Sequence, residues 1–127
     1  LHDALPIWNF SAYYNQIEKA INRNDIVNLN NRVAAFLDSY FDIIFAINEL
    51  PHPGEKRLLS IVNTMCKKLP NNALADIEKL IEDISKCDNV ILEDINEIVI
   101  QLDIILKSEN LISWIDNVYN DGLYCYN

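Results

Sequence analysis

The sequence predicts an all-α protein, an antiparallel bundle of four main helices plus one or two short terminal helices. The 127 residues include only two glycines and four prolines, so the chain has few turns and long elements. Half of the residues are hydrophobic, which excludes a disordered chain. These residues recur at the i, i+3, i+4 spacing of one helix face. A chain of this length is expected to form one domain with its own core.

The apolar repeats, and the residues that interrupt them, predict six helices. In chain order the helices cover residues 9 or 11 to 23, 25–50, 55–69, 72–85, 88 or 89 to 107, and 108 or 110 to 119. Ser11 and Asp25 are expected N-caps, because their side chains can accept a hydrogen bond from the first helical turn. Pro51 is expected to end the second helix, because the residue before a proline avoids the helical region. The fifth segment is rich in Ile, but its length and 3.6-residue period favour helix over strand.

The second predicted helix is expected to be the centre of the bundle. Its apolar residues are Leu29, Val33, Phe36, Leu37, Tyr40, Phe41, Ile44, Phe45 and Ile47. They cover more than one face, and a helix with such wide apolar coverage is packed by several neighbours.

The chain divides into three parts. Residues 1–7 lack the basic start and the long apolar run of a signal peptide, and we expect them to be a non-native leader. Residues 8–120 are expected to form the single helical bundle domain. Residues 121–127 are expected to be an irregular tail.

The charge balance restricts the partners. Nineteen acidic and ten basic residues give a formal net charge of −9, which argues against direct binding to a nucleic-acid backbone. The longest apolar run, residues 33–47, contains Asp38 and Asp42, and these carboxylates would be costly inside a membrane. We therefore expect a protein that binds neither membrane nor nucleic acid directly.

The three cysteines indicate a reducing, cytoplasmic setting. Cys66, Cys87 and Cys125 are odd in number and widely spaced, and no CxxC pair is present. This pattern favours neither a disulfide framework nor a zinc site. Cys66 and Cys87 occupy apolar helix positions and are expected to be small core residues.

A polar stripe on the second helix is the first candidate site. Asn28, Arg32, Ala35, Ser39 and Asp42 follow one another at steps of four, three, four and three residues, so they share one face. One interpretation is a groove that offers Arg32 to a phosphate or carboxylate and Asp42 to a hydroxyl. The alternative, which the sequence favours, is a solvated strip or polar pairs to another helix.

The corner at residues 51–54, Pro-His-Pro-Gly, is the second candidate. Two prolines fix φ there, and Glu55, Lys56 and Arg57 follow at the expected start of the third helix. Such a helix start, with nearby cations, can hold an anion, and His52 can titrate near neutral pH. The alternative is an exposed, well-capped corner.

A carboxylate-rich segment and the known catalytic motifs give no further site. The segment comprises Glu78, Glu82, Asp83, Glu93, Asp94 and Glu97. No His lies after position 52, so the Glu-x-x-His pairs of a di-iron bundle are missing, and we expect these carboxylates on the surface. The sequence also lacks a Gly-rich phosphate loop, HExxH and GxSxG. We therefore assign no catalytic residue and no metal ligand.

Two blocks of sequence carry a family resemblance. They are Asn31-Arg32-Val33-Ala34-Ala35 with Tyr40-Phe41-Asp42, and His52-Pro53-Gly54-Glu55-Lys56-Arg57. With the residues around them, about 9–107, they resemble the C-terminal helical domain of bacterial proteins in the DNA polymerase beta-like nucleotidyltransferase superfamily, in a subfamily without assigned substrate.

The resemblance implies a parent with an N-terminal α/β domain that binds a nucleoside triphosphate and Mg²⁺ through a Gly-Ser turn and an Asp-x-Asp pair. This chain contains no Gly-Ser, no Asp-x-Asp and no strand pattern. We therefore expect a substrate-binding, cleft-closing helical domain that is no enzyme alone and needs no cofactor. Its expected partner is the missing N-terminal nucleotidyltransferase domain. The resemblance suggests these substrate-facing residues: Arg32, Asp42, Asn48, His52, Glu55, Lys56 and Arg57.

A second function fits the same composition. High aromatic and Ile content under an acidic surface is also typical of a stand-alone helical interaction module, either antitoxin-like or homodimeric. An exposed apolar patch would mark such an interface. Arg32, His52 and Lys56 at the rim of the patch would favour the substrate-binding domain, and a purely aliphatic patch on the fourth and fifth helices would favour the interaction module.

Overall fold

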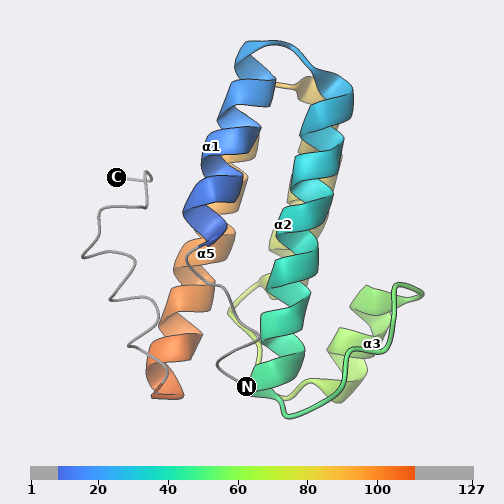
Figure 1. The fold of residues 1–127 in the computed structure, drawn as a ribbon. Coiled ribbons are helices and arrows are strands. Elements are labelled where there is room, and N and C mark those ends of the chain that lie inside the picture. The colour runs from blue at the N-terminus through green and yellow to red at the C-terminus, as the bar shows by residue number, and fades with distance from the viewer. Residues whose placement is uncertain (1–8, 111–127) are drawn as a thin grey trace.

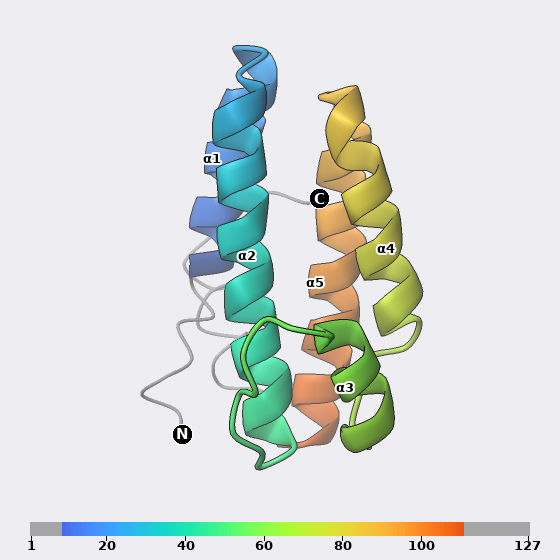
Figure 2. The ribbon, with the colours of Figure 1, turned by 90° about the vertical axis from the view of Figure 1, so that its right-hand side faces the viewer.

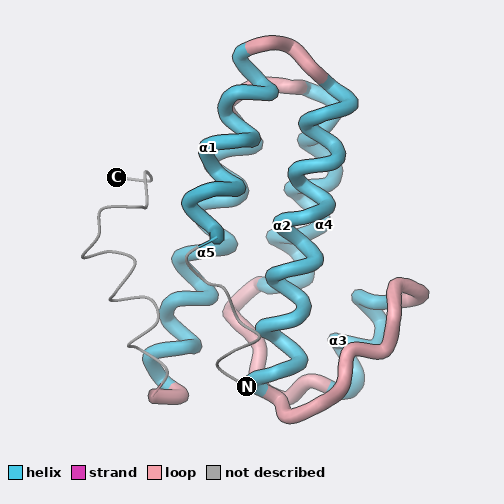
Figure 3. Tube along the Cα trace, viewed as in Figure 1, coloured by secondary structure: helices cyan, strands magenta, loops and turns pink. Residues whose placement is uncertain are grey.

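The all-α prediction is confirmed by the computed structural model, which describes residues 9–110 (Figures 1 and 3). Its elements are α1 (Asn9–Asn22), α2 (Ile26–Ile47), α3 (Leu58–Met65), α4 (Ala73–Asp83), the 3-10 turn η2 (Ile84–Lys86) and α5 (Val90–Ser108). The described residues contain no strand. The predicted last helix, residues 108–119, lies almost entirely outside the described residues, as does Cys125.

Four helices form the bundle, and each runs antiparallel to the next along the chain. α1 packs along α2, α4 packs along α5, and α1 also contacts α5. Figure 2 shows the two hairpins standing side by side, with the short α3 outside them across the lower ends of α2 and α4. The short helix outside the four-helix bundle is therefore α3, which lies in the middle of the chain and not at one of its ends.

α2 is extensively buried, as its apolar coverage predicts, but α5 is buried to a similar extent and contacts both α1 and α4. Nine of the 22 residues of α2 are buried. Phe36, in the middle of the helix, packs against α1, with its ring 5.4 Å from that of Phe10 and 6.3 Å from that of Tyr13. The side chains buried most completely come from α1, α2, α4 and α5: Tyr40, Phe10, Phe36, Ile17, Leu29, Ile43, Ile44, Ile77, Leu80, Ile91 and Ile95.

The two expected N-caps have different outcomes. Asp25 does cap α2, because its side chain accepts a hydrogen bond from the Asn28 amide at 3.2 Å. Ser11 does not cap α1, because the helix already begins at Asn9 and Ser11 lies inside it with a buried side chain. Aromatic packing of α1 on α2 compensates for the weak helix propensity of Asn9 and Phe10.

The corner after α2 is longer than predicted. α2 ends at Ile47, three residues before the expected position, because Asn48 caps it and Glu49 adopts a left-handed φ of 57°. The third helix begins at Leu58 rather than Glu55, after Arg57 in a left-handed conformation with φ of 56°. Pro51 therefore lies within the corner and does not itself end the helix.

The fourth predicted helix becomes α4 and the 3-10 turn η2. Cys87 follows η2 with a φ of 50° and is half-buried, so it ends this segment and is not the core residue that we expected. Cys66 is buried as predicted. No described helix is long and apolar enough to cross a membrane.

Candidate functional site

The residues predicted to face a substrate lie toward two ends of α2. Arg32 is in the first third of the helix, whereas Asn48 caps its last turn. Sixteen residues separate them, or about 24 Å along the axis at 1.5 Å per residue. His52, Glu55, Lys56 and Arg57 follow in the exposed corner next to Asn48. The structure therefore does not bring Arg32 together with the corner.

Asn48 connects the end of α2 to the link between α3 and α4. Its amide nitrogen donates to the carbonyl of Ile44 at 2.7 Å and to that of Lys68 at 2.9 Å. Its amide oxygen accepts from the Lys68 amide at 2.9 Å. Both functional groups of this side chain are therefore engaged in holding the fold together.

The other corner residues differ in how far they are fixed. The Nδ1 atom of His52 accepts from the Gly54 amide at 3.0 Å, and its ring lies 5.2 Å from that of Phe45. Gly54 has a φ of 99°, a conformation that favours glycine. Lys56 and Arg57 are exposed, and neither pairs with a carboxylate of the described residues.

Glu55 and Asp42 complete the predicted set. Both side chains are exposed, Glu55 in the corner and Asp42 in the last third of α2. Their role toward a substrate stays a prediction.

The polar stripe on α2 mostly faces α1. Arg32 Nη1 donates to Oε1 of Gln16 at 3.4 Å, and the hydroxyls of Ser39 and Tyr13 are 2.8 Å apart. For Arg32 and Ser39, these contacts agree with the alternative interpretation, in which the stripe forms polar pairs with another helix.

One part of the stripe nevertheless opens into a cleft. The cleft has a volume of about 260 Å³ and lies between α1 and the first half of α2. Its lining consists of Gln16, Lys19, Arg23, Asn28 and Arg32. We call it the basic cleft, because three of its five residues are cationic and none is acidic.

The cations of the basic cleft differ from several other cations of the chain because they form no ion pair with the described residues. The chain has ten Lys and Arg residues. Four of them, Lys68, Lys79, Lys86 and Lys107, pair with carboxylates. No carboxylate of the described residues pairs with any cation of the cleft. Six cations therefore make no ion pair with a carboxylate of the described residues, and three of these six converge on one small space, which favours an anion there.

The carboxylate-rich segment is only partly on the surface, which corrects our expectation. Asp83 and Asp94 are buried. Lys79 bridges them, with its Nζ 2.8 Å from Asp83 Oδ2 and 2.7 Å from Asp94 Oδ1, and Lys86 binds the other oxygen of Asp83 at 2.9 Å. A buried charge is tolerated when it is paired in this way, so α4, η2 and α5 are joined by an ionic network.

The pKa values of Asp83 and Asp94 are shifted in opposite directions. The hydrogen bond from Asp94, followed by those from Lys79 and Lys86, holds the pKa of Asp83 well below its usual range. Burial, with the hydrogen bond to Asp83, raises the pKa of Asp94. Asp94 Oδ2 has no hydrogen-bond partner among the described residues. The two carboxyl groups therefore titrate as an interacting pair.

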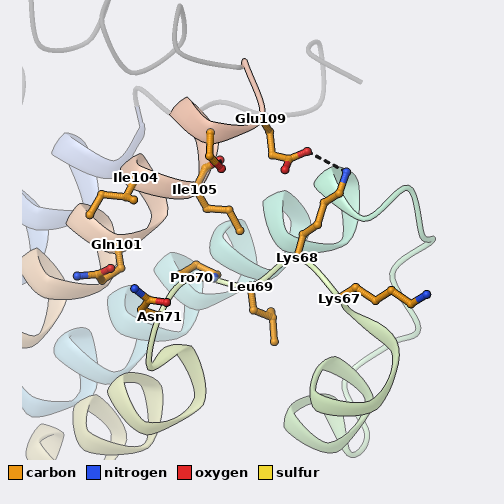
Figure 4. Close-up of a pocket in the computed structure, with 10 residues that line it drawn as sticks. Lys67, Lys68, Leu69, Pro70, Asn71, Gln101, Ile104, Ile105 and Glu109 are labelled. Carbon is orange, nitrogen blue, oxygen red and sulfur yellow. Dashed lines mark hydrogen bonds and ion pairs between the residues drawn. The ribbon is translucent and has the colours of Figure 1, made fainter.

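A further pocket lies at the C-terminal end of α5. It lies between the α3–α4 link and the last turns of α5, and Figure 4 shows Lys68 paired with Glu109 at 2.8 Å at its edge. Lys67 extends away from the pocket (Figure 4). Ile104 and Leu69 supply apolar lining, but no unpaired charge points inward, so this pocket lacks the features of a specific polar site.

The described residues contain no group of three or more His, Cys, Asp or Glu side chains that could hold a metal ion. No family model, curated protein or solved structure matches this chain. The assignment of the candidate site is therefore supported by the residues of this chain alone.

The sequence reasoning identified Arg32 but missed Lys19 and Arg23. Lys19 and Arg23 are four residues apart on the polar side of α1, a spacing that places them on one face. Their separation was visible in the sequence. The pairing of that face with Arg32 was not, because it depends on how α1 and α2 align after the turn at Asn24.

Proposed function

We propose that this chain is a ligand-binding helical domain that holds a phosphate-bearing substrate through the basic cleft. The proposal is carried by the convergence of Lys19, Arg23 and Arg32. Arg guanidinium groups bind phosphate through charge-assisted hydrogen bonds, often two at a time. The amides of Gln16 and Asn28 add neutral donors beside the cations.

The size of the cleft indicates what part of a ligand it takes. Pockets that enclose a drug-sized molecule have volumes of roughly 300–1,000 Å³. The basic cleft, at about 260 Å³, falls below that range and is open to solvent. It suits a phosphate or short phosphate chain, with the remainder of the ligand outside.

The family resemblance supplies the wider context of the proposal. In a nucleotidyltransferase-like parent, this domain would close over a cleft and contact substrate, while the N-terminal domain supplied nucleotide, Mg²⁺ and catalysis. Asp42 or Glu55 would orient, or deprotonate, an acceptor hydroxyl on a part of the substrate outside the basic cleft, since neither residue lines the cleft. The expected genomic sequence upstream of residue 8 contains a Gly-Ser turn followed by Asp-x-Asp, and a sequence without them would contradict this assignment.

Calorimetric titration with tripolyphosphate tests the anion site without knowledge of the natural substrate. Removing one charge-assisted contact costs about 1.5–3 kcal/mol, so Arg32→Gln should weaken binding by roughly 10- to 100-fold. Lys56→Gln is the matched control, because it removes an exposed, unpaired cation at the other end of α2. Equal affinity in wild type and Arg32→Gln, with the fold intact, would refute the assignment.

A second candidate function is the helical interaction module. It is favoured by an apolar groove of about 370 Å³ between α2, α3 and α4, lined almost entirely by aliphatic and aromatic side chains. The groove does not lie on α4 and α5 alone, and its one charged residue is Arg57. It therefore matches neither of the two patches described above completely.

A further inference from the structure

The three cations of the basic cleft form a row along the α1–α2 hairpin. Arg32 of α2 contacts Gln16 of α1, with 3.4 Å between Nη1 and Oε1, so Gln16 marks the level along α1 that the Arg32 side chain reaches. Lys19 and Arg23 follow Gln16 at steps of three and four residues, a spacing that places them on one face. The cations therefore come in the order Arg32, Lys19 and Arg23 toward the turn that joins the two helices (Figure 1).

The length of this row can be worked out from the helix rise. Arg23 follows the last residue of α1, but its backbone amide still donates to the Lys19 carbonyl at 3.1 Å, so the helical spacing continues to it. At 1.5 Å per residue, Lys19 lies about 4.5 Å beyond the level of Gln16, and Arg23 lies about 6 Å beyond Lys19. The row is therefore about 10 Å long.

The α2 wall of the cleft adds a neutral donor to the row. Asn28 lies four residues before Arg32, or about 6 Å nearer the turn, which places it between the levels of Lys19 and Arg23. Asp25 is the carboxylate closest to this end in sequence. It accepts a hydrogen bond from the Asn28 backbone amide at 3.2 Å and does not line the cleft. The whole length of the cleft therefore offers donors to an anion.

We propose that the basic cleft binds a linear chain of three phosphates along the hairpin, with one phosphate beside each of Arg32, Lys19 and Arg23. Charge-assisted hydrogen bonds to phosphate are about 2.7–2.9 Å long, so a single phosphate suits one or two neighbouring cations, whereas a linked chain reaches all three. This inference rests on the proposed function and adds the class of ligand. Free polyphosphate and triphosphate esters both carry such a chain.

Calorimetric titration of the full chain with pyrophosphate and tripolyphosphate, in Mg²⁺-free buffer, tests the row. Pyrophosphate spans the closer pair, Arg32 and Lys19, and tripolyphosphate adds the contact with Arg23. Arg23→Gln should therefore weaken tripolyphosphate binding by at least roughly tenfold and leave pyrophosphate binding unchanged, whereas Arg32→Gln should weaken both. Arg57→Gln is the matched control and should alter neither, because it removes an exposed Arg outside the cleft.

Two results separate this inference from the proposed function. Equal weakening of both ligands by Arg23→Gln would mean that the three cations surround a single point, which overturns the row but leaves the anion site. No saturable binding of either ligand would refute the anion site and the row together. Arg23 is exposed and makes no ion pair with the described residues, so the substitution leaves the fold intact.

Titration with adenosine triphosphate under the same conditions distinguishes the two sources of the chain. Affinity equal to or above that for tripolyphosphate would assign the site to a triphosphate ester, and lower affinity would assign it to free polyphosphate. In either case Arg23→Gln should weaken the tighter ligand by at least roughly tenfold. An unchanged affinity of that ligand in Arg23→Gln would overturn the proposal.

Discussion

Substitution of Asn48 by Ala tests whether this residue holds the fold together. The change removes the hydrogen bonds to the carbonyls of Ile44 and Lys68 and from the amide of Lys68, with lengths of 2.7, 2.9 and 2.9 Å. A hydrogen bond contributes about 1 kcal/mol net. Because water can reach the freed groups of Lys68, which is exposed, we expect a loss of about 2 kcal/mol, or roughly 10 °C in melting temperature for a domain of this size.

Urea denaturation followed by far-UV circular dichroism measures this loss. Asn30→Ala is the control, because Asn30 is exposed on the same helix and donates only to the Ile26 carbonyl at 2.8 Å. Ala is also the better helix former, so its free energy of unfolding should change by less than about 0.5 kcal/mol. If Asn48→Ala were as stable as Asn30→Ala, Asn48 would be free to serve a substrate and the structural role would be wrong.

Three further perturbations probe the cap, the core and the ionic network. Asp25→Ala should cost about 0.5–2 kcal/mol in a thermal melt, because it removes the N-cap of α2. Leu102→Ala should cost about 2–5 kcal/mol in urea, because Leu102 is fully buried, whereas Ile104→Ala should cost under about 1 kcal/mol. Asp94 has a raised pKa, so its ionisation lowers wild-type stability as pH rises from about 4. Asp94→Asn should remove that decline in pH-dependent unfolding, and an unchanged slope would contradict the raised pKa of Asp94.

Local signals in the sequence were sufficient to predict the fold class and some of the helix boundaries. Asp25 caps α2 because a cap involves only the next three residues, and the apolar coverage of α2 predicts its extensive burial. The end of α2 could not be predicted in the same way. It is fixed by Asn48 and Lys68, twenty residues apart in sequence, while the more obvious Pro51 lies beyond it.

The residues of the candidate site could likewise be predicted from the sequence only in part. Arg32 was identified because its stripe is periodic along one helix. Lys19 and Arg23 were not, since their approach to Arg32 depends on the packing of two helices. Asp83 and Asp94 were assigned to the surface by residue type, whereas Lys79 and Lys86 pair with them in the fold and allow burial.

The most direct test of the anion site is a backbone amide NMR titration of the full chain with tripolyphosphate. Binding in the basic cleft predicts that the largest chemical-shift changes fall on Gln16, Lys19, Arg23, Asn28 and Arg32. The same titration of Arg32→Gln should lose these changes at equal ligand concentration. Shifts centred on residues 52–57, or no saturable shift at all, would contradict the proposed function.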